Sequence, residues 1–285
     1  SRQERSASRP VDARMTTPPV AGKGPMRETT AAPDWFYAAL HRGHPGDVAF
    51  YLAQCRGAKE ALELGVGYGR IALALAREGV EVTGLELDPA LLAQARRAAA
   101  GSPPEVRSRL SMLGGDMRRF DLGRRFARVF LPYSGLFCLL DDASVDACFR
   151  AVARHLLPGG RFVFDTYQAD DLHADPDAMD GETDETPLVE LDVQGGRYAV
   201  TERVRWARAD QRLDTTYVAY RQDTDGGERH VQTIPQRYLT RAQVTRALAR
   251  ACLVPHGVYG GFDGGACCPS SPIRVVVAGL VDDAT

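Results

Sequence analysis

The feature that most constrains this sequence is a glycine-rich segment that closes one apolar run and opens another. It comprises Glu63-Leu64-Gly65-Val66-Gly67-Tyr68-Gly69-Arg70, between an apolar stretch that begins near Ala61 and a helical pattern over residues 70–78. Positions without side chains let a ligand approach the backbone closely, and the N–H groups of a helix that begins there point toward it. The segment therefore predicts a strand, a ligand-binding turn and a helix in direct succession.

Strand and helix patterns continue to alternate along the chain. Asp88 and Pro89 supply an N-cap and a first-turn proline for one of the predicted helices. Apolar strands that alternate with helices are typical of an α/β fold in which helices cover both faces of a parallel sheet. We expect strands at about 61–65, 81–87, 109–112, 127–131, 160–166, 253–259 and 273–281, and helices at about 70–78, 88–100, 143–156 and 240–251.

The remaining segments differ from this pattern in composition and in the spacing of their apolar residues. Residues 1–33 are rich in Pro, Ser, Thr, Ala and Arg and predict a disordered or extended tail. Residues 34–57 carry aromatic side chains on two short helical patterns, which we expect to form a helical lid. Residues 168–238 begin with an acidic loop and continue with alternating polar and apolar runs that predict an antiparallel β insert over the substrate site. The core would then comprise residues 58–167 and 239–285.

Composition argues against several classes of protein. The 285 residues are 44% hydrophobic, enough for a sizeable core, and the formal net charge of -2 provides no basic field for a polyanion. Apolar runs are shorter than the roughly 18 residues that a membrane span needs, and the first residues lack the apolar region of a signal peptide. Six scattered cysteines without a CxxC pair are typical of reduced thiols. We therefore expect a cytoplasmic protein with neither a nucleic-acid partner nor a membrane partner.

A second acidic residue, Glu86, stands 21 residues after Gly65 at the end of the second predicted strand. A carboxylate there can accept hydrogen bonds from both hydroxyls of a ribose, each contributing roughly 1.5 to 3 kcal/mol. A dinucleotide is disfavoured because its G-x-G-x-x-G fingerprint places the third glycine one residue later, and because Glu63 would repel a pyrophosphate. Glu63 suits a cationic amino-acid moiety instead. The two acids and the turn predict a cofactor that contains a nucleoside.

With these elements in order, the sequence resembles the class I S-adenosylmethionine-dependent methyltransferases from Asp34 onward. The segment from Glu63 to Gly69 matches the family's first motif, and Glu86 matches its ribose-binding acid. Gly115-Asp116-Met117 is similar to the segment that holds the adenine ring, with Asp116 receiving the amino group and Met117 packing on the ring face. Leu131-Pro132-Tyr133-Ser134 is similar to the substrate-facing motif, and Leu157-Pro158-Gly159-Gly160 to the turn into the fifth strand.

The resemblance implies a Rossmann-like seven-stranded sheet, mostly parallel with its last strand antiparallel, that binds S-adenosylmethionine and releases S-adenosylhomocysteine. The lid and the β insert are most similar in architecture to glycine N-methyltransferase and the amino-sugar N-methyltransferases. That similarity implies a small-molecule acceptor enclosed by lid, insert and core. We expect a monomer or homodimer, and methyl transfer from an activated sulfonium requires no metal. The residues expected around the cofactor are Glu63, Gly65, Gly67, Gly69, Arg70, Glu86, Leu87, Asp116, Met117, Leu131 and Pro132.

Catalysis of this kind depends mainly on alignment, because the sulfonium methyl group is already activated. Holding an acceptor lone pair about 3 to 3.5 Å from that methyl group can account for roughly 7 to 11 kcal/mol of the barrier. The candidate catalytic residues are Tyr133 in the substrate-facing motif and Tyr37 and His41 in the lid. The tyrosines would align the acceptor, and His41 or its neighbour His44 would serve as a base for a hydroxyl acceptor.

The leading interpretation is methyl transfer to a nitrogen or oxygen of a small molecule in specialised metabolism. Three alternatives stay open. A peptide or RNA methyltransferase would use the arginines of residues 1–33 as a binding arm. A non-catalytic protein would bind the nucleoside without consuming it, and an NAD-dependent oxidoreductase would use a similar sheet. The sequence leaves the identity of the acceptor and the choice between nitrogen and oxygen undecided.

Overall fold

The computed structural model describes residues 27–29, 33–175, 180–193, 195–223 and 228–281. They divide into two compact units. The first unit comprises the described parts of residues 1–39, 180–206 and 214–234, and the second those of residues 40–179, 207–213 and 235–285.

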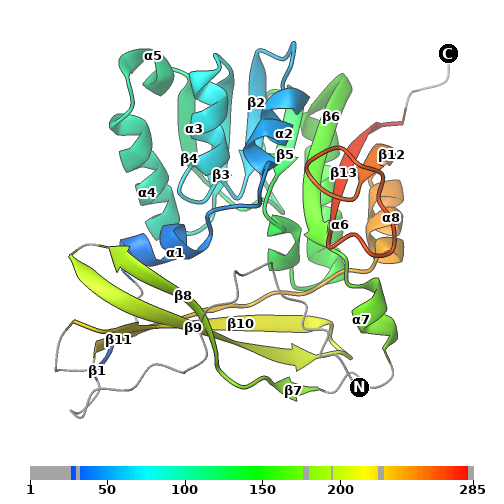
Figure 1. The fold of residues 1–285 in the computed structure, drawn as a ribbon. Coiled ribbons are helices and arrows are strands. Elements are labelled where there is room, and N and C mark those ends of the chain that lie inside the picture. The colour runs from blue at the N-terminus through cyan, green and yellow to red at the C-terminus, as the bar shows by residue number, and fades with distance from the viewer. Residues whose placement is uncertain (1–26, 30–32, 176–179, 194, 224–227, 282–285) are drawn as a thin grey trace. The chain divides into compact units, whose positions relative to one another are not determined.

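The second unit is built on a seven-stranded sheet with the order β12-β13-β6-β5-β2-β3-β4 (Figure 1). The strands from β6 to β4 pair in parallel, whereas β13 is antiparallel to both β6 and β12. The predicted Rossmann-like sheet is therefore confirmed. Its strands are β2 (Glu60–Leu64), β3 (Glu81–Glu86), β4 (Leu110–Gly114), β5 (Phe126–Leu131), β6 (Leu156–Tyr167), β12 (Leu253–Tyr259) and β13 (Ile273–Leu280).

Helices pack on both faces of this sheet because its strands alternate apolar side chains between the two faces. On one face Val163 belongs to a cluster with Tyr51, Leu75 and Leu92. On the other, the ring of Phe149 lies 5.6 Å from that of Phe164, the next residue along β6. The helices are α2 (Asp47–Gln54), α3 (Arg70–Arg77), α4 (Pro89–Ala100), α5 (Pro104–Arg107), η1 (Gly135–Cys138, a 3-10 turn), α6 (Asp142–His155), α7 (Asp170–Ala174) and α8 (Arg241–Arg250).

Side-chain caps fix where two of these helices begin. Asp88 accepts hydrogen bonds from the N–H groups of Ala90 and Leu91 at the start of α4, as its position before Pro89 predicts. At the start of α8, Thr240 and Gln243 form a reciprocal capping box. The caps satisfy helical N–H groups that would otherwise lack acceptors, so the helices start where the sequence places them.

The first unit holds a six-stranded sheet with the order β1-β11-β10-β9-β7, in which β8 also pairs with β9. The pairs β8–β9, β7–β9 and β10–β11 are antiparallel, as predicted, whereas β1 lies parallel to β11. The helix of this unit packs its Trp35 ring 4.7 Å from Tyr198. The elements are β1 (Arg27–Thr29), α1 (Asp34–Leu40), β7 (Gly181–Glu182), β8 (Thr186–Val193), β9 (Gly196–Ala207), β10 (Arg212–Arg221) and β11 (Glu228–Ile234).

The acidic segment that the sequence describes as a loop contains regular structure on both sides of residues 176–179, which lie outside the described residues. Asp170 opens the short helix α7, and its carboxylate accepts from the backbone N–H of Arg241 at 3.0 Å and pairs with Arg274 at 3.1 Å. The strand β7 follows at Gly181–Glu182. An ion pair with the buried Arg274 holds Asp170 of α7, and β7 forms by pairing with β9.

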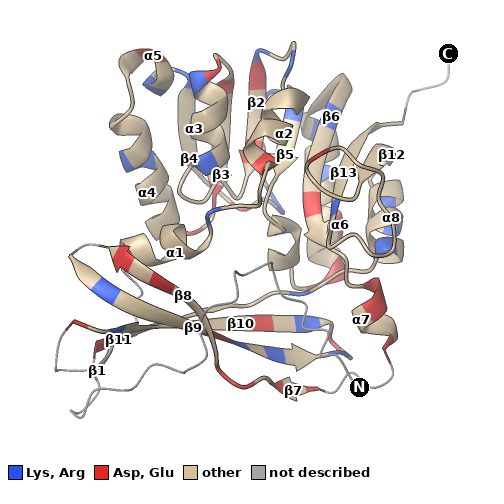
Figure 2. Cartoon of the chain, in the orientation of Figure 1, with Lys and Arg blue, Asp and Glu red and all other residues tan. Residues whose placement is uncertain are grey.

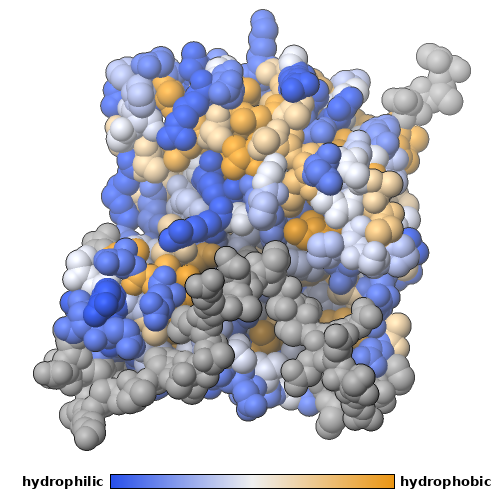
Figure 3. Space-filling view, in the orientation of Figure 1, coloured by the Kyte–Doolittle hydropathy of each residue, from blue (hydrophilic) through white to orange (hydrophobic). Residues whose placement is uncertain are grey.

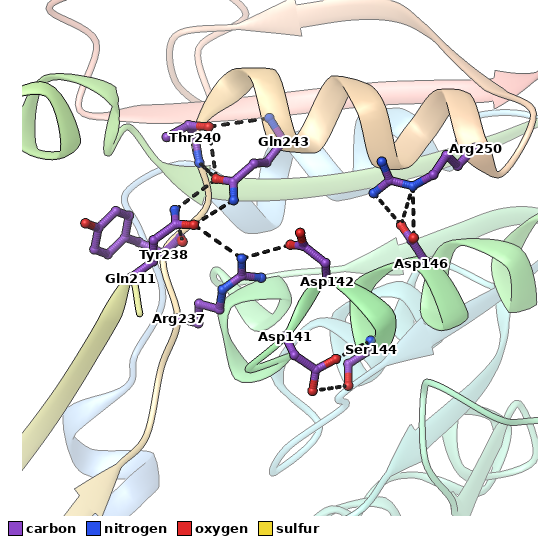
Figure 4. A network of polar contacts seen from close by, with 10 residues as sticks. All are labelled: Asp141, Asp142, Ser144, Asp146, Gln211, Arg237, Tyr238, Thr240, Gln243 and Arg250. Carbon is purple, nitrogen blue, oxygen red and sulfur yellow. Dashed lines mark hydrogen bonds and ion pairs between the residues drawn. The ribbon is translucent and has the colours of Figure 1, made fainter. Parts of the chain in front are cut away.

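A polar network ties the chain around residues 211 and 237–240 to α6 and α8 (Figure 4). The side-chain amides of Gln211 and Gln243 exchange hydrogen bonds of 2.9 and 2.6 Å. Arg237 donates to Gln211 at 3.2 Å and pairs with Asp142 at 2.8 Å. These contacts anchor the two points where the chain re-enters the second unit.

Charged and hydrophobic side chains are distributed differently over the described surface. Acidic and basic residues are interspersed over the described elements of both units (Figure 2), and hydrophobic residues gather over α2 and α3 on the face drawn in Figure 3. Among the described residues, the helices are all too short or too polar to cross a membrane. All six cysteines are free thiols.

Candidate active site

The glycine turn between β2 and α3 has the conformation that its sequence predicts. Gly65, Gly67 and Gly69 have φ values of 62°, 58° and 93°, in the left-handed region that favours glycine. A Cβ atom built on Gly65 would meet no other atom within 4 Å, so the space beside this residue is open. The turn therefore combines a left-handed backbone, which glycine adopts without strain, with room for a ligand at the carboxyl end of β2.

Glu86 lies at the carboxyl end of the adjacent strand β3 and is fixed by two backbone donors. Its Oε2 accepts from the N–H of Gly67 at 2.8 Å, and its Oε1 accepts from the N–H of Asp88 at 2.9 Å. Each carboxylate oxygen can accept a further hydrogen bond. The predicted ribose-binding acid is thus buried and oriented by the same turn that would approach the cofactor.

Glu63, at the end of β2, is only 3% exposed, and its Oε2 has no hydrogen-bond partner among the described residues. Burial raises the pKa of this carboxyl to about 8, partly offset by nearby Arg70 and reinforced by the charge of Glu86. A buried acceptor without a donor is costly, and a cationic amino group beside it would supply both a donor and a charge. The environment of Glu63 therefore fits the amino-acid end of S-adenosylmethionine.

Two apolar positions flank these carboxylates. Leu87 follows Glu86 and is 65% exposed, the largest exposure among the large hydrophobic residues that the structure describes. Leu131 and Pro132, at the end of β5, are buried. An exposed leucine next to a ribose-binding acid fits one face of an adenine ring, because stacking would remove apolar surface from water.

The structure gives Asp116 a partner that the sequence did not indicate. Arg118 donates to its Oδ2 at 2.7 Å and to its Oδ1 at 2.9 Å, and these hydrogen bonds hold the pKa of Asp116 below its ordinary value. An adenine amino group would therefore share the carboxylate with Arg118. Met117, beside it, is half-buried. The adenine-binding role of both residues stays a prediction.

Arg70 is also engaged within the protein. Its guanidinium makes a two-pronged pair with Asp47 at 2.8 and 2.6 Å and lies 6.0 Å from the centre of the Tyr133 ring. Gly43 has a φ of 93°, so a side chain there would be strained, and a Cβ atom would come within 2.3 Å of the guanidinium carbon and displace it. Arg70 thus joins α2, the glycine turn and Tyr133, in addition to the cofactor contact predicted for it.

Two of the three predicted catalytic residues lie together. The ring of Tyr133 is 5.8 Å from that of His41 and 4.9 Å from that of His44. Tyr68, from the glycine turn, donates to the backbone oxygen of His41 at 2.9 Å. Tyr37 belongs to the first unit, and its catalytic role stays a prediction.

Asp165, near the end of β6, was not among the predicted site residues. It is fully buried, and it accepts hydrogen bonds from the backbone N–H groups of Tyr133 and Ser134, both at 2.8 Å. The sequence marks Asp165 only as an acidic residue within the apolar run of β6. That signal was insufficient to predict its hydrogen bonds with the Tyr133-Ser134 segment of the substrate-facing motif.

Comparison with known proteins finds similarity to methyltransferases. Residues 61–160 match the model of a family described as "Methyltransferase domain". A curated relative, dTDP-3-amino-3,6-dideoxy-alpha-D-glucopyranose N,N-dimethyltransferase of Streptomyces fradiae, is 31% identical over 155 residues, which cover 52% of this chain and 58% of the relative. The chain thus matches little more than half the length of that protein.

Solved structures extend the similarity to most of the chain. The CcbJ methyltransferase of Streptomyces caelestis superimposes with a TM-score of 0.72 and 27% identity, over 84% of this chain and 98% of CcbJ. The glycopeptide N-methyltransferase MtfA, solved in complex with S-adenosyl-L-methionine, gives a TM-score of 0.55 and 26% identity, over 84% of this chain and 95% of MtfA. The predicted resemblance is confirmed: residues 61–160 match a methyltransferase domain, and most of the chain is similar to methyltransferase structures, one of which was solved with S-adenosyl-L-methionine.

Proposed function

We propose that this protein transfers a methyl group from S-adenosylmethionine to an amine nitrogen of a small-molecule acceptor of the amino-sugar class, in specialised metabolism. The observation that carries the proposal is the pair of buried carboxylates, Glu63 and Glu86, at the carboxyl ends of adjacent strands beside the open glycine turn. The names of the Streptomyces fradiae relative and of MtfA, both N-methyltransferases, support the choice of nitrogen.

Four residues would hold the cofactor. Glu63 would accept from the amino group, Glu86 from the ribose hydroxyls, and Gly65 would leave room for the amino-acid portion. The exposed side chain of Leu87 would cover one face of the adenine ring. When bound, S-adenosylmethionine supplies a methyl group on a cationic sulfur, which keeps the bonding electron pair and departs as a neutral thioether.

Residues of the second unit would align the acceptor. Tyr133 follows the end of β5, and its ring lies beside His41 and His44. An amine must present an uncharged lone pair and lose a proton as the new N–C bond forms. We assign alignment of the acceptor to Tyr133, and reception of that proton to His41. Tyr37, which belongs to the first unit, stays a candidate for a role in catalysis.

Oxygen methylation is the nearest alternative, because the imidazole of His41 would also serve a hydroxyl acceptor. Peptide or RNA acceptors, and binding of the nucleoside without catalysis, remain alternatives of a different kind. All of these share the cofactor site and differ in whether a methyl group is transferred and in which acceptor receives it.

The test is to incubate the purified chain with S-adenosylmethionine and matched panels of amino sugars and of the same sugars with a hydroxyl in place of the amine. We expect S-adenosylhomocysteine to form, and the amino sugar to gain a methyl group by mass spectrometry, only with the amine panel. Methylation of the hydroxyl panel would assign oxygen instead. Tight cofactor binding without turnover on small molecules, peptides or RNA would favour the non-catalytic alternative.

A further inference from the structure

Asp165 has an unusually complete set of partners for a buried carboxylate. It is 0% exposed, and its Oδ1 accepts from the Tyr133 N–H at 2.8 Å and from the Tyr51 hydroxyl at 2.6 Å. Its Oδ2 accepts from the Ser134 N–H at 2.8 Å. Burying an isolated carboxylate is costly, so three donors from two other segments indicate that this side chain organises them.

The two residues whose N–H groups bind Asp165 have a strained backbone. Tyr133 and Ser134 have φ values of 60° and 53°, and neither is glycine. A non-glycine residue is disfavoured in this left-handed region and persists only where its surroundings impose it. Consecutive left-handed residues point both N–H groups toward one acceptor, and the carboxylate of Asp165 occupies that position.

The strand register explains how Asp165 reaches this turn. Leu131, the last residue of β5, pairs with Phe164 of the parallel strand β6, so Asp165 follows directly after the end of that pairing. On its other side β5 pairs with β2, where Phe130 is opposite Glu63. The Asp165 contact therefore lies at the carboxyl ends of the parallel strands, where ligands bind in open α/β sheets.

Helix α2 supports the same turn through a second route. Its Tyr51 is fully buried against Phe130 and donates to Asp165. One helical turn earlier, Asp47 accepts hydrogen bonds from the guanidinium of Arg70, which lies 6.0 Å from the centre of the Tyr133 ring. Two residues of one helix thus secure the backbone of Tyr133 and the surroundings of its side chain.

We propose that Asp165 is a positioning residue for methyl transfer: by accepting from the N–H groups of Tyr133 and Ser134, it holds the left-handed turn that fixes the Tyr133 ring against the acceptor. This inference rests on the proposed function and adds a residue to it. Asp165 does not touch the reacting atoms, and it acts through the backbone of Tyr133.

The charge of Asp165 matters to this role. Burial raises its pKa to about 6, against the opposing effect of hydrogen bonds from Tyr51, Ser134 and Tyr133, and the charge of Asp47 on α2 raises it further. The carboxylate is therefore ionised at neutral pH and gains a proton below about pH 6. A protonated carboxyl presents an O–H toward N–H and hydroxyl donors, which weakens the turn.

The first test compares Asp165→Asn with Tyr51→Phe. The asparagine side chain keeps the shape but faces the peptide donors with an NH₂ group in place of one oxygen, whereas the phenylalanine removes a single donor and leaves both backbone contacts. We expect Asp165→Asn to lower kcat about a hundredfold, the loss typical of a misplaced aligning group. Its dissociation constant for S-adenosylmethionine should stay within about threefold of the wild-type value, and Tyr51→Phe should lower kcat by less than about fivefold.

A second variant tests the backbone mechanism itself. Glycine adopts the left-handed region without strain, and the buried Oγ of Ser134 has no hydrogen-bond partner among the described residues. The double variant Asp165→Asn, Ser134→Gly should therefore recover kcat by about tenfold over Asp165→Asn alone, because glycine relieves the strain of the left-handed backbone at this position. Absence of any rescue, together with equal losses of kcat, cofactor affinity and thermal stability, would reduce Asp165 to a structural role and overturn the inference.

Hydrogen exchange separates this inference from the proposed function. Because one side-chain oxygen is replaced by an NH₂ group, the N–H groups of Tyr133 and Ser134 lose one of their two acceptor atoms and should exchange faster in Asp165→Asn than in the wild type, with Tyr51→Phe intermediate. Unchanged exchange would overturn the positioning role even if methyl transfer is established. Faster exchange in a protein that methylates no amine would instead leave the turn as described and refute the proposed function.

Discussion

The backbone N–H of Gly67 donates to Oε2 of Glu86 at 2.8 Å, across 19 residues of sequence. This bond joins the turn after β2 to the end of β3 and fixes the carboxylate that we assign to the ribose. The space beside Gly65 in the same turn is open. A substitution at Glu86 should therefore lower the affinity for the cofactor more than it lowers the stability of the fold.

Replacing Glu86 by alanine should weaken binding of S-adenosylmethionine roughly ten- to a hundredfold, because the ribose hydroxyls and the Gly67 N–H both lose their acceptor. Isothermal titration calorimetry measures the change. Glu81→Ala is the matched control, since Glu81 lies exposed at the opposite end of the same strand. Equal affinity in wild type and Glu86→Ala would show that the ribose lies elsewhere.

Binding of S-adenosylmethionine at pH 7 should release a proton from Glu63. The pKa of about 8 keeps this carboxyl protonated in the free protein at pH 7, and a cationic amino group beside it lowers that pKa and ionises it. Affinity should therefore rise with pH up to about 8. Calorimetry in buffers of different ionisation enthalpy counts the proton, and Glu63→Gln should release none. A wild type that takes up protons at pH 7 would contradict the assignment.

Replacing Leu87 by serine should lower the affinity for S-adenosylmethionine about three- to tenfold, which corresponds to roughly 1 kcal/mol of apolar surface that no longer covers the adenine ring. The free energy of unfolding should stay unchanged, because the side chain is 65% exposed. Val258→Ser, at another exposed hydrophobic residue, serves as the control and should leave affinity intact. A loss of stability with unchanged affinity would assign Leu87 to packing.

Tyr133→Phe should lower kcat about three- to tenfold, the effect of one lost hydrogen bond, with cofactor affinity nearly unchanged. Tyr37→Phe should likewise lower kcat while leaving cofactor affinity nearly unchanged. Steady-state kinetics and calorimetry on the same preparations separate the two effects, with Tyr259→Phe on β12 as the control. If kcat and cofactor affinity fell together in Tyr133→Phe, the hydroxyl would serve the cofactor rather than the acceptor.

The network in Figure 4 makes a prediction about stability. Arg237 is buried and bonded to Gln211 and Asp142, so Arg237→Met should lower the free energy of unfolding by about 1.5 to 3 kcal/mol. Arg250→Met removes an exposed pair with Asp146 and should cost at most about 1 kcal/mol. Urea unfolding compares the two variants, and equal losses would mean that burial of Arg237 adds nothing.

The sequence was sufficient to predict the strands of the second unit and its longer helices, because their signals are local. It missed the short helices α5, η1 and α7, and β6 begins at Leu156, so that the predicted turn at Leu157-Pro158-Gly159-Gly160 lies within the strand. The cap at Asp88 and the glycine turn mark where helices begin, and both lie where expected. The strand β1 had no such signal. Its three residues, Arg27–Thr29, are too few to show a period, and they become a strand only by pairing with Glu228 and its neighbours in β11.

The predicted site was less complete, because several of its contacts join distant segments. Tyr51 and Asp165 are 114 residues apart in sequence, and neither belongs to a motif. Arg70 lies in the glycine turn, yet its strongest partner, Asp47, comes from the segment predicted as a lid. Motifs identify side chains that face a ligand, whereas the residues that hold those side chains are found only once the strands are in register.

The most direct test of the whole account is the structure of this protein in complex with S-adenosylhomocysteine. We predict that the ribose hydroxyls lie within hydrogen-bond distance of Glu86, that the amino group lies against Glu63, and that the sulfur faces Tyr133. A nucleoside bound elsewhere, or one whose ribose and amino group contact neither carboxylate, would contradict the account.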